Sequence, residues 1–128
     1  MNRKNSFGSA VLITVFLLMS SFSTTVPVKK FKPEGTWKYS APAAPEGYTI
    51  GFFIIEKGES GYEVTFMLDE YSKVKANEVN YKRRNLEFVL YLENELVRIT
   101  GTFEDDKFTG KASYSEGVID ITAVREET

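Results

Sequence analysis

The stretch YEVTFML, residues 62–68, decides the fold class of this chain. Every second residue from Tyr62 to Leu68 is large and apolar, whereas Glu63 and Thr65 occupy alternate positions. Side chains point to opposite faces of a β-strand in turn, so this pattern predicts a strand with one buried face.

Similar runs recur along the chain and are separated by turn residues at nearly regular intervals. This spacing is typical of an antiparallel meander, here of about eight strands. Half-buried strands of a single kind predict a closed barrel or a sandwich, and we expect an all-β, small barrel. The expected strands are residues 35–40, 48–56, 62–68, 73–81, 86–92, 96–103, 108–114 and 118–125.

The fourth expected strand changes phase halfway along. Val74 and Ala76 fall on one face, but Val79 and Tyr81 fall on the other. One extra residue in a strand produces such a shift, so we expect a β-bulge near residues 77–78.

The N-terminus has the pattern of an export signal. Arg3 and Lys4 precede an apolar run, residues 11–19, and small polar residues follow it. The run is too short to span a membrane. We therefore predict a signal peptide at 1–23, an entry segment at 24–34 and a β-barrel domain at 35–128, exported to the bacterial periplasm or the extracellular space.

Composition narrows the chemistry. The 128 residues include 16 Lys plus Arg, 18 Asp plus Glu, and neither His nor Cys. Loss of Arg3 and Lys4 with the signal leaves 14 basic and 18 acidic residues, a net charge of −4, which disfavours nucleic acid as a partner. Without His and Cys the commonest general base, the usual zinc ligands and all thiol mechanisms are missing. We expect no cofactor, no metal and no disulfide.

The sequence Gly35-Thr36-Trp37 lies on the first expected strand, and Arg125 lies near the end of the last one. This combination resembles the calycin superfamily, the lipocalin-like and avidin-like barrels. The chain also looks like other small exported bacterial domains. The calycin resemblance implies that Gly35, Trp37 and Arg125 close one end of the barrel, with the guanidinium packed over the indole ring.

Several aromatic residues are candidates for ligand binding. Tyr48 and the proline-rich loop 41–47 should form the rim of the open barrel end, with Tyr71 nearby. The expected ligand is small and apolar or sugar-like. A solid core filled by inward aromatic side chains is the alternative. The inward aromatic residues that we expect to line a cavity are Phe52, Phe66 and Phe88.

Two strands are apolar on both faces. Phe53 and Ile55 oppose Phe52, and Tyr91 opposes the inward side chains of its own strand. Such an outer face needs a cover, either from the same chain or from a protein partner or second copy. We therefore name Phe53, Ile55 and Tyr91 as possible protein contacts.

Paired carboxylates are the remaining route to catalysis. Glu63, Glu78, Glu87 and Asp120 are the conceivable members of a glycan-acting pair, but their alternation places most of them toward solvent. We therefore predict an exported, non-catalytic binding or accessory module. The alternatives are a carboxylate-dependent glycan-acting enzyme and a structural or inhibitor protein that docks through its outer apolar face.

Overall fold

The computed structural model of the protein describes residues 30–127, so the expected signal peptide lies outside the described residues. Regular structure in the described part is entirely β, as predicted. None of these residues belongs to a helix long and apolar enough to cross a membrane. The strands are β1 (Gly35–Ser40), β2 (Ile50–Gly58), β3 (Gly61–Met67), β4 (Lys73–Lys75), β5 (Asn77–Lys82), β6 (Asn85–Leu92), β7 (Glu95–Glu104), β8 (Lys107–Tyr114) and β9 (Gly117–Arg125).

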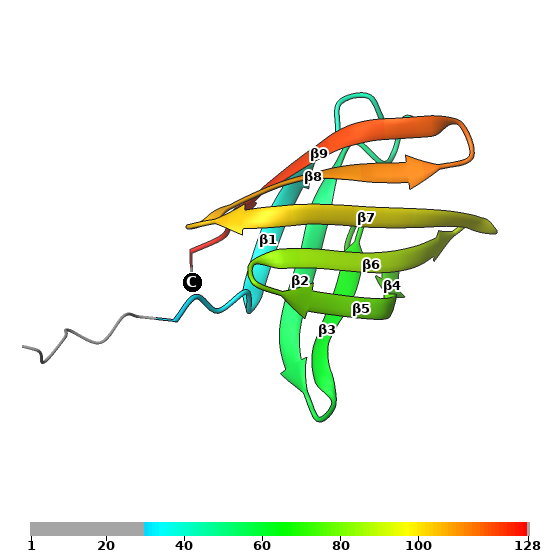
Figure 1. The fold of residues 1–128 in the computed structure, drawn as a ribbon. Coiled ribbons are helices and arrows are strands. Elements are labelled where there is room, and N and C mark those ends of the chain that lie inside the picture. The colour runs from blue at the N-terminus through cyan, green and yellow to red at the C-terminus, as the bar shows by residue number, and fades with distance from the viewer. Residues whose placement is uncertain (1–29, 128) are drawn as a thin grey trace, which may run out of the picture. The chain divides into compact units, whose positions relative to one another are not determined.

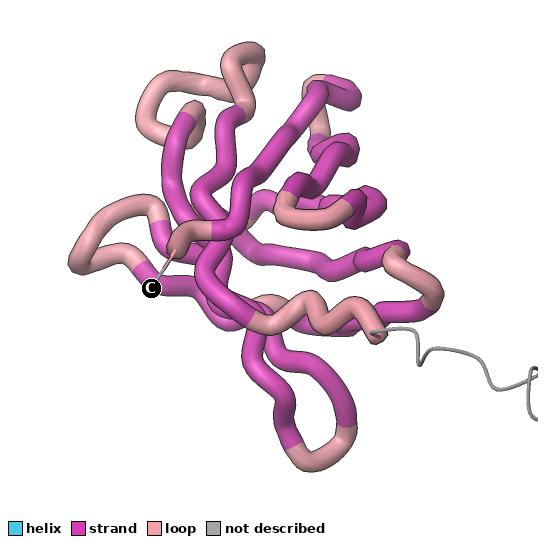
Figure 2. Tube along the Cα trace, turned by 90° about the vertical axis from the view of Figure 1, so that its left-hand side faces the viewer, coloured by secondary structure: helices cyan, strands magenta, loops and turns pink. Residues whose placement is uncertain are grey.

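The strands form one antiparallel meander that is nearly closed into a barrel (Figure 1). Their order in the sheet is β4-β3-β2-β1-β9-β8-β7-β6-β5, so the first strand pairs with the last. The two outermost strands of this order, β4 and β5, follow each other directly in the chain. In Figure 2 the hairpin that joins β2 to β3 projects below the rest of the barrel.

The predicted bulge explains why there are nine strands and not eight. The segment from Lys73 to Lys82 changes its partner along its length: β4 pairs with β3, whereas β5 pairs with β6. The register shifts between Asn77 and Asn80, and Glu78 takes a positive φ of 51°. At the junction the Ala76 amide donates to the Val64 carbonyl over 2.8 Å, which joins the segment to β3. A single bulged segment therefore connects the two edges of the sheet.

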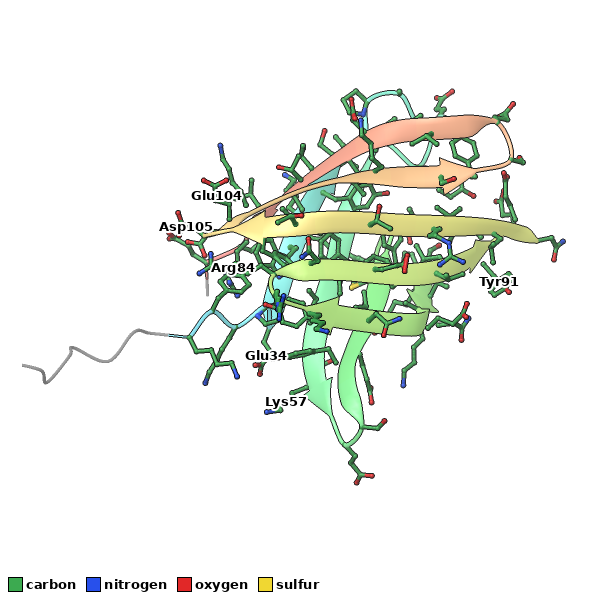
Figure 3. All side chains as sticks on the ribbon, in the orientation of Figure 1. Glu34, Lys57, Arg84, Tyr91, Glu104 and Asp105 are labelled. Atoms are coloured by element: carbon green, nitrogen blue, oxygen red, sulfur yellow. The ribbon has the colours of Figure 1, made fainter. Side chains whose placement is uncertain are left out.

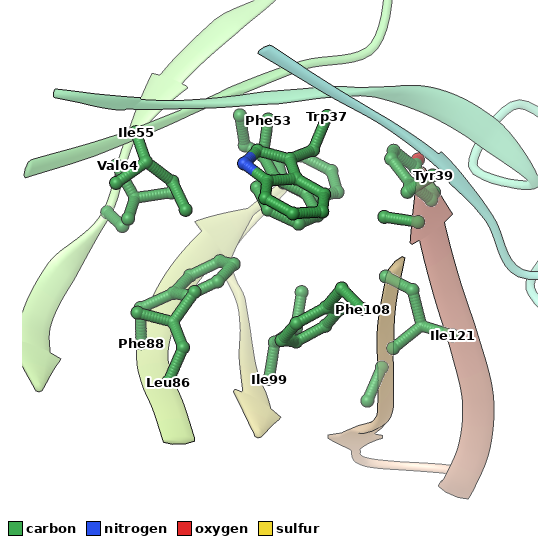
Figure 4. Packing of buried hydrophobic residues seen from close by; sticks show 14 of the residues in the cluster. Trp37, Tyr39, Phe53, Ile55, Val64, Leu86, Phe88, Ile99, Phe108 and Ile121 are labelled. Atoms are coloured by element: carbon green, nitrogen blue, oxygen red, sulfur yellow. The ribbon is translucent and has the colours of Figure 1, made fainter. Parts of the chain in front are cut away.

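The interior is filled by aromatic and branched side chains from every long strand (Figure 4). Phe53 and Phe108 meet edge to face with ring centroids 5.5 Å apart, and Trp37 lies 4.7 Å from Phe103. Such pairs add to the free energy gained by burying apolar surface. The largest fully buried side chains are Trp37, Tyr39, Phe53, Phe88, Phe103, Phe108, Ile55, Leu86, Leu90, Ile99, Ile121 and Val64.

The orientation of β2 corrects the prediction for that strand. Phe53 and Ile55 are 0% and 1% exposed and belong to the core, whereas Phe52 is half-buried on the outer face. The register decides this, because Phe53 pairs with the inward-facing Phe66 and cross-strand partners share a face. Both faces of β2 are apolar in sequence, so alternation alone could not fix its phase.

One end of the barrel, which we call the plugged end, is built around Trp37. The indole is fully buried and its Nε1 donates to the Pro33 carbonyl over 2.9 Å. The guanidinium carbon of Arg125 lies 4.6 Å from the centre of the Trp37 ring, as the resemblance implied. Gly35 takes a φ of +137°, and a Cβ there would lie 3.3 Å from an Arg125 guanidinium nitrogen, so both conformation and space favour glycine.

The segment before β1 is part of this plugged end. Arg125 donates to the carbonyls of Lys32 and Glu34 and to the Asp106 carboxylate. Phe31 lies beneath two guanidinium groups, 4.9 Å from that of Arg84 and 5.5 Å from that of Arg125. Figure 3 shows Glu34 and Arg84 gathered at this end. Residues 31–34 therefore cover the plugged end.

Candidate functional site

A cavity of about 210 Å³ lies at the barrel end opposite Trp37, where β1 leads into the loop 41–49. Side chains from β1, β3, β6, β7, β8 and β9 line it together with that loop. Its wall is mostly aliphatic or aromatic. The lining residues are Tyr39, Ala41, Ala44, Pro45, Tyr48, Phe66, Leu90, Leu92, Glu93, Glu95, Val97, Ile99, Ala112, Tyr114, Ile119 and Ile121.

Tyr39 connects the cavity to the core. It is 2% exposed, and its ring stacks on Phe66 with centroids 4.8 Å apart. Its hydroxyl donates to the carbonyl of Tyr48 over 2.9 Å. Burial, with a smaller contribution from Tyr48, raises the pKa of Tyr39 to about 12. The phenol therefore stays neutral at physiological pH and holds the loop against the barrel.

The loop 41–49 is held by its own hydrogen bonds. The Ala41 amide donates to the Thr49 carbonyl over 2.8 Å, and the Ala44 amide donates to the Ala41 carbonyl over 2.9 Å. A third bond runs from the Tyr48 amide to the Pro45 carbonyl over 3.0 Å. These bonds, together with two proline residues, limit the conformations open to the loop, so the cavity wall is preformed.

Two carboxylates lie at the mouth of the cavity, on the hairpin between β6 and β7. Glu93 and Asn94 take φ angles of 50° and 68°, the left-handed pair that a tight hairpin turn requires. Glu95 accepts hydrogen bonds from the amide of Ser115, over 2.9 Å, and from the Ser115 hydroxyl. These bonds lower the pKa of Glu95, because they stabilise its charged form.

Tyr48 is the residue that brings the loop and this hairpin together. The pKa of its hydroxyl is raised by desolvation and then by the neighbouring carboxylates of Glu93 and Glu95. The mouth therefore combines a phenol with two carboxylates above an apolar interior.

Of the five residues that the sequence analysis predicted to bind a ligand, two line this cavity and three lie elsewhere. Tyr48 and Phe66 line the cavity. Phe88 is buried in the middle of the core, 6.0 Å from Phe53. The other two lie outside the cavity wall, since Phe52 is on the outer face and Tyr71 is 91% exposed beyond the end of β3.

Four residues of the cavity lining that carry polar groups were not among the candidates: Tyr39, Glu93, Glu95 and Tyr114. The alternation of the strands indicated that the two tyrosines face inward. Tyr39 is in phase with Trp37, and Tyr114 is in phase with Phe108. The two glutamates look like ordinary turn residues in the sequence. Only the approach of Tyr48 and Ser115 reveals their place at the mouth.

The expected protein-contact residues do not form one surface. Phe53 and Ile55 are in the core, so that part of the expectation is wrong. Tyr91 is 57% exposed and pairs across the hairpin with Leu96, which is 44% exposed. Figure 3 shows Tyr91 at the end of β6 opposite Arg84. The outer apolar residues of β2 are instead Ile50, Phe52 and Ile54.

The carboxylates considered for catalysis lie on the outer strand faces. Glu63 forms an ion pair with Lys75 over 3.3 Å, and Glu87 forms one with Arg98 over 3.5 Å. Asp120 pairs with Lys111, its cross-strand partner. These groups therefore belong to cross-strand pairs on the surface and not to the cavity.

The chain matches no known protein-family model, and no curated protein resembles it significantly. Its function is therefore inferred from the geometry of the cavity.

Proposed function

We propose that this protein is an exported, non-catalytic binding protein that holds a small, mostly apolar ligand in the cavity at the open barrel end. The observation that carries this proposal is the cavity of about 210 Å³, walled by apolar side chains beside a hydrogen-bonded loop. Ligand sites are typically concave and apolar with a few polar groups that orient the ligand. This volume is below the roughly 300–1,000 Å³ of common ligand pockets, which favours a small molecule.

Two further observations support the same proposal. The meander closes by pairing of its first and last strands, and Arg125 stacks on Trp37, which supports a calycin-like assignment for the barrel. The N-terminal sequence, in which two basic residues precede an apolar run, supports export. Fold likeness argues little about activity, so the cavity remains the main support.

The direct test is titration of the isotope-labelled mature domain with small neutral probes, benzyl alcohol and hexanol, followed by NMR. We expect saturable shifts in the signals of Tyr39, Leu90 and Ile121, which line the cavity, and none at the plugged end. Shifts spread evenly over the surface, or no saturation, would contradict the proposal.

A matched pair of variants on β8 makes this test sharper. Ala112→Leu adds bulk inside the cavity and should abolish binding, because Ala112 lines it. Ser113→Leu adds the same side chain on the outer face of the same strand and should leave binding unchanged. Thermal unfolding of both variants verifies that they fold.

A further inference from the structure

We propose that the ligand carries a positively charged amine, which is bound at the mouth by Glu93 and Glu95 while its apolar part fills the cavity. This inference rests on the proposed function and names the chemical class of its ligand. That class is a small hydrophobic amine, protonated at neutral pH.

The charged residues of the cavity lining are all acidic. Glu93 and Glu95 are its charged members, and no lysine or arginine from residues 30–127 lines it. Neither glutamate forms a salt bridge with another described residue, in contrast to Glu63, Glu87 and Asp120 on the outer face. Two carboxylates thus line the mouth of an apolar space, and neither forms an ion pair with a basic side chain of residues 30–127. A ligand cation is the group that would complete this arrangement.

Aromatic rings strengthen the case for a cation. Tyr39, Tyr48 and Tyr114 all contribute to the cavity wall, and the faces of aromatic rings attract ammonium groups. The mouth, with one phenol and two carboxylates, suits the ammonium group of an amphipathic amine, and the apolar interior suits its hydrophobic part. It suits an anionic ligand poorly, because the ligand charge would lie beside two carboxylates.

The Glu95 carboxylate is held in place before any ligand arrives. Ser115 donates two hydrogen bonds to one oxygen of Glu95, which leaves the second oxygen available. The backbone of Glu93 lies in a tight two-residue turn, and Glu93 lines the cavity together with Tyr48. Groups oriented in advance lose less conformational entropy on binding, so this geometry favours recognition of the amine.

The experiment compares three ligands of similar shape by calorimetry at pH 7 and low salt: phenethylamine, phenethyl alcohol and phenylpropionate. We expect the amine to bind at least about tenfold more tightly than the alcohol, and the carboxylate to bind more weakly than either. Added salt should weaken amine binding and leave alcohol binding nearly unchanged.

Variants identify the residues responsible. Glu93→Gln and Glu95→Gln should each reduce the advantage of the amine over the alcohol, while alcohol binding persists. Glu116→Gln removes one negative charge from the turn between β8 and β9, outside the cavity lining, and should have little effect. Alcohol binding serves as the check that each variant retains its folded cavity.

The outcomes separate this inference from the proposed function. If the alcohol binds in the cavity and the amine binds no better, the inference is overturned and the binding function stands. The inference is also overturned if both Gln variants retain the full amine advantage. If none of the three ligands binds to folded protein, both proposals fail.

Discussion

Trp37 and Arg125 are direct cross-strand partners, and the guanidinium carbon lies 4.6 Å from the indole centroid. The same guanidinium donates to the carbonyls of Lys32 and Glu34. A single side chain on the last strand therefore holds the plug of the first strand and the segment that precedes it.

Substitution of Trp37 and Arg125, singly and together, should show that the two side chains stabilise each other. Trp37→Ala should cost about 3–5 kcal/mol of unfolding free energy, because it leaves a large void in the core. Arg125→Ala should cost less, since the side chain is partly exposed. In a double-mutant cycle measured by urea unfolding, we expect a coupling energy of about 0.5–2 kcal/mol from the cation–π contact. Strictly additive effects would contradict the pairing.

A methyl group should not be tolerated on the inner face of β8. A Cβ at Gly110 would lie 2.1 Å from the Thr100 carbonyl oxygen and 2.9 Å from the Gly101 Cα. Both neighbours are backbone atoms of β7, so the strands must separate. We expect Gly110→Ala to lower the unfolding free energy by about 1–3 kcal/mol. Thr109→Ala, on the exposed face of the same strand, is the control and should change stability by much less.

Alkaline pH should weaken the fold through Tyr39. Its pKa is raised by burial from the ordinary 10.0 to about 12 in the folded protein. The unfolded chain therefore loses this proton at lower pH than the folded one, and stability falls as pH rises from 10 to 12. The contribution lost is about 2–3 kcal/mol. In Tyr39→Phe, the slope of unfolding free energy against pH over this window should be shallower. Equal slopes in the two proteins would show that Tyr39 does not titrate in this way.

The expected signal peptide gives a prediction outside the described residues. Expression in a bacterial host should yield exported protein cleaved between about Phe22 and Val26, where small residues follow the apolar run. Mass spectrometry of the exported protein measures the new N-terminus. An intact Met1 on exported protein would disprove cleavage.

Strand phase could be predicted wherever one face was clearly polar. The alternation in residues 62–68 indicated the correct inward face, and the break between Ala76 and Val79 marked the bulge in the segment that changes partner. The inward face of β2 was predicted wrongly, because Phe52 and Phe53 are equally apolar. Their faces were decided by pairing with β3, which is a property of register and not of composition.

The candidate site was only partly predictable for a related reason. Tyr48 follows the proline-rich loop 41–47, so the sequence predicted it as a ligand-binding residue. Glu93 and Glu95 belong to a turn more than forty residues away and were not predicted. Their approach depends on closure of the barrel, which brings the loop after β1 next to the hairpin between β6 and β7. Long-range contacts of this kind leave no local pattern in a single sequence.

The pairing of β1 with β9 determines when this chain is able to fold. Residue 37 is synthesised well before its partner at residue 125, because seven other strands lie between them in the chain. Until β9 arrives, β1 lacks one neighbour and the Trp37 ring has no guanidinium above it. Closure by such distant segments makes folding slow compared with the formation of local hairpins. The hairpins of the meander can therefore form first, and the plugged end around Trp37 can be completed only when β9 is available to pair with β1.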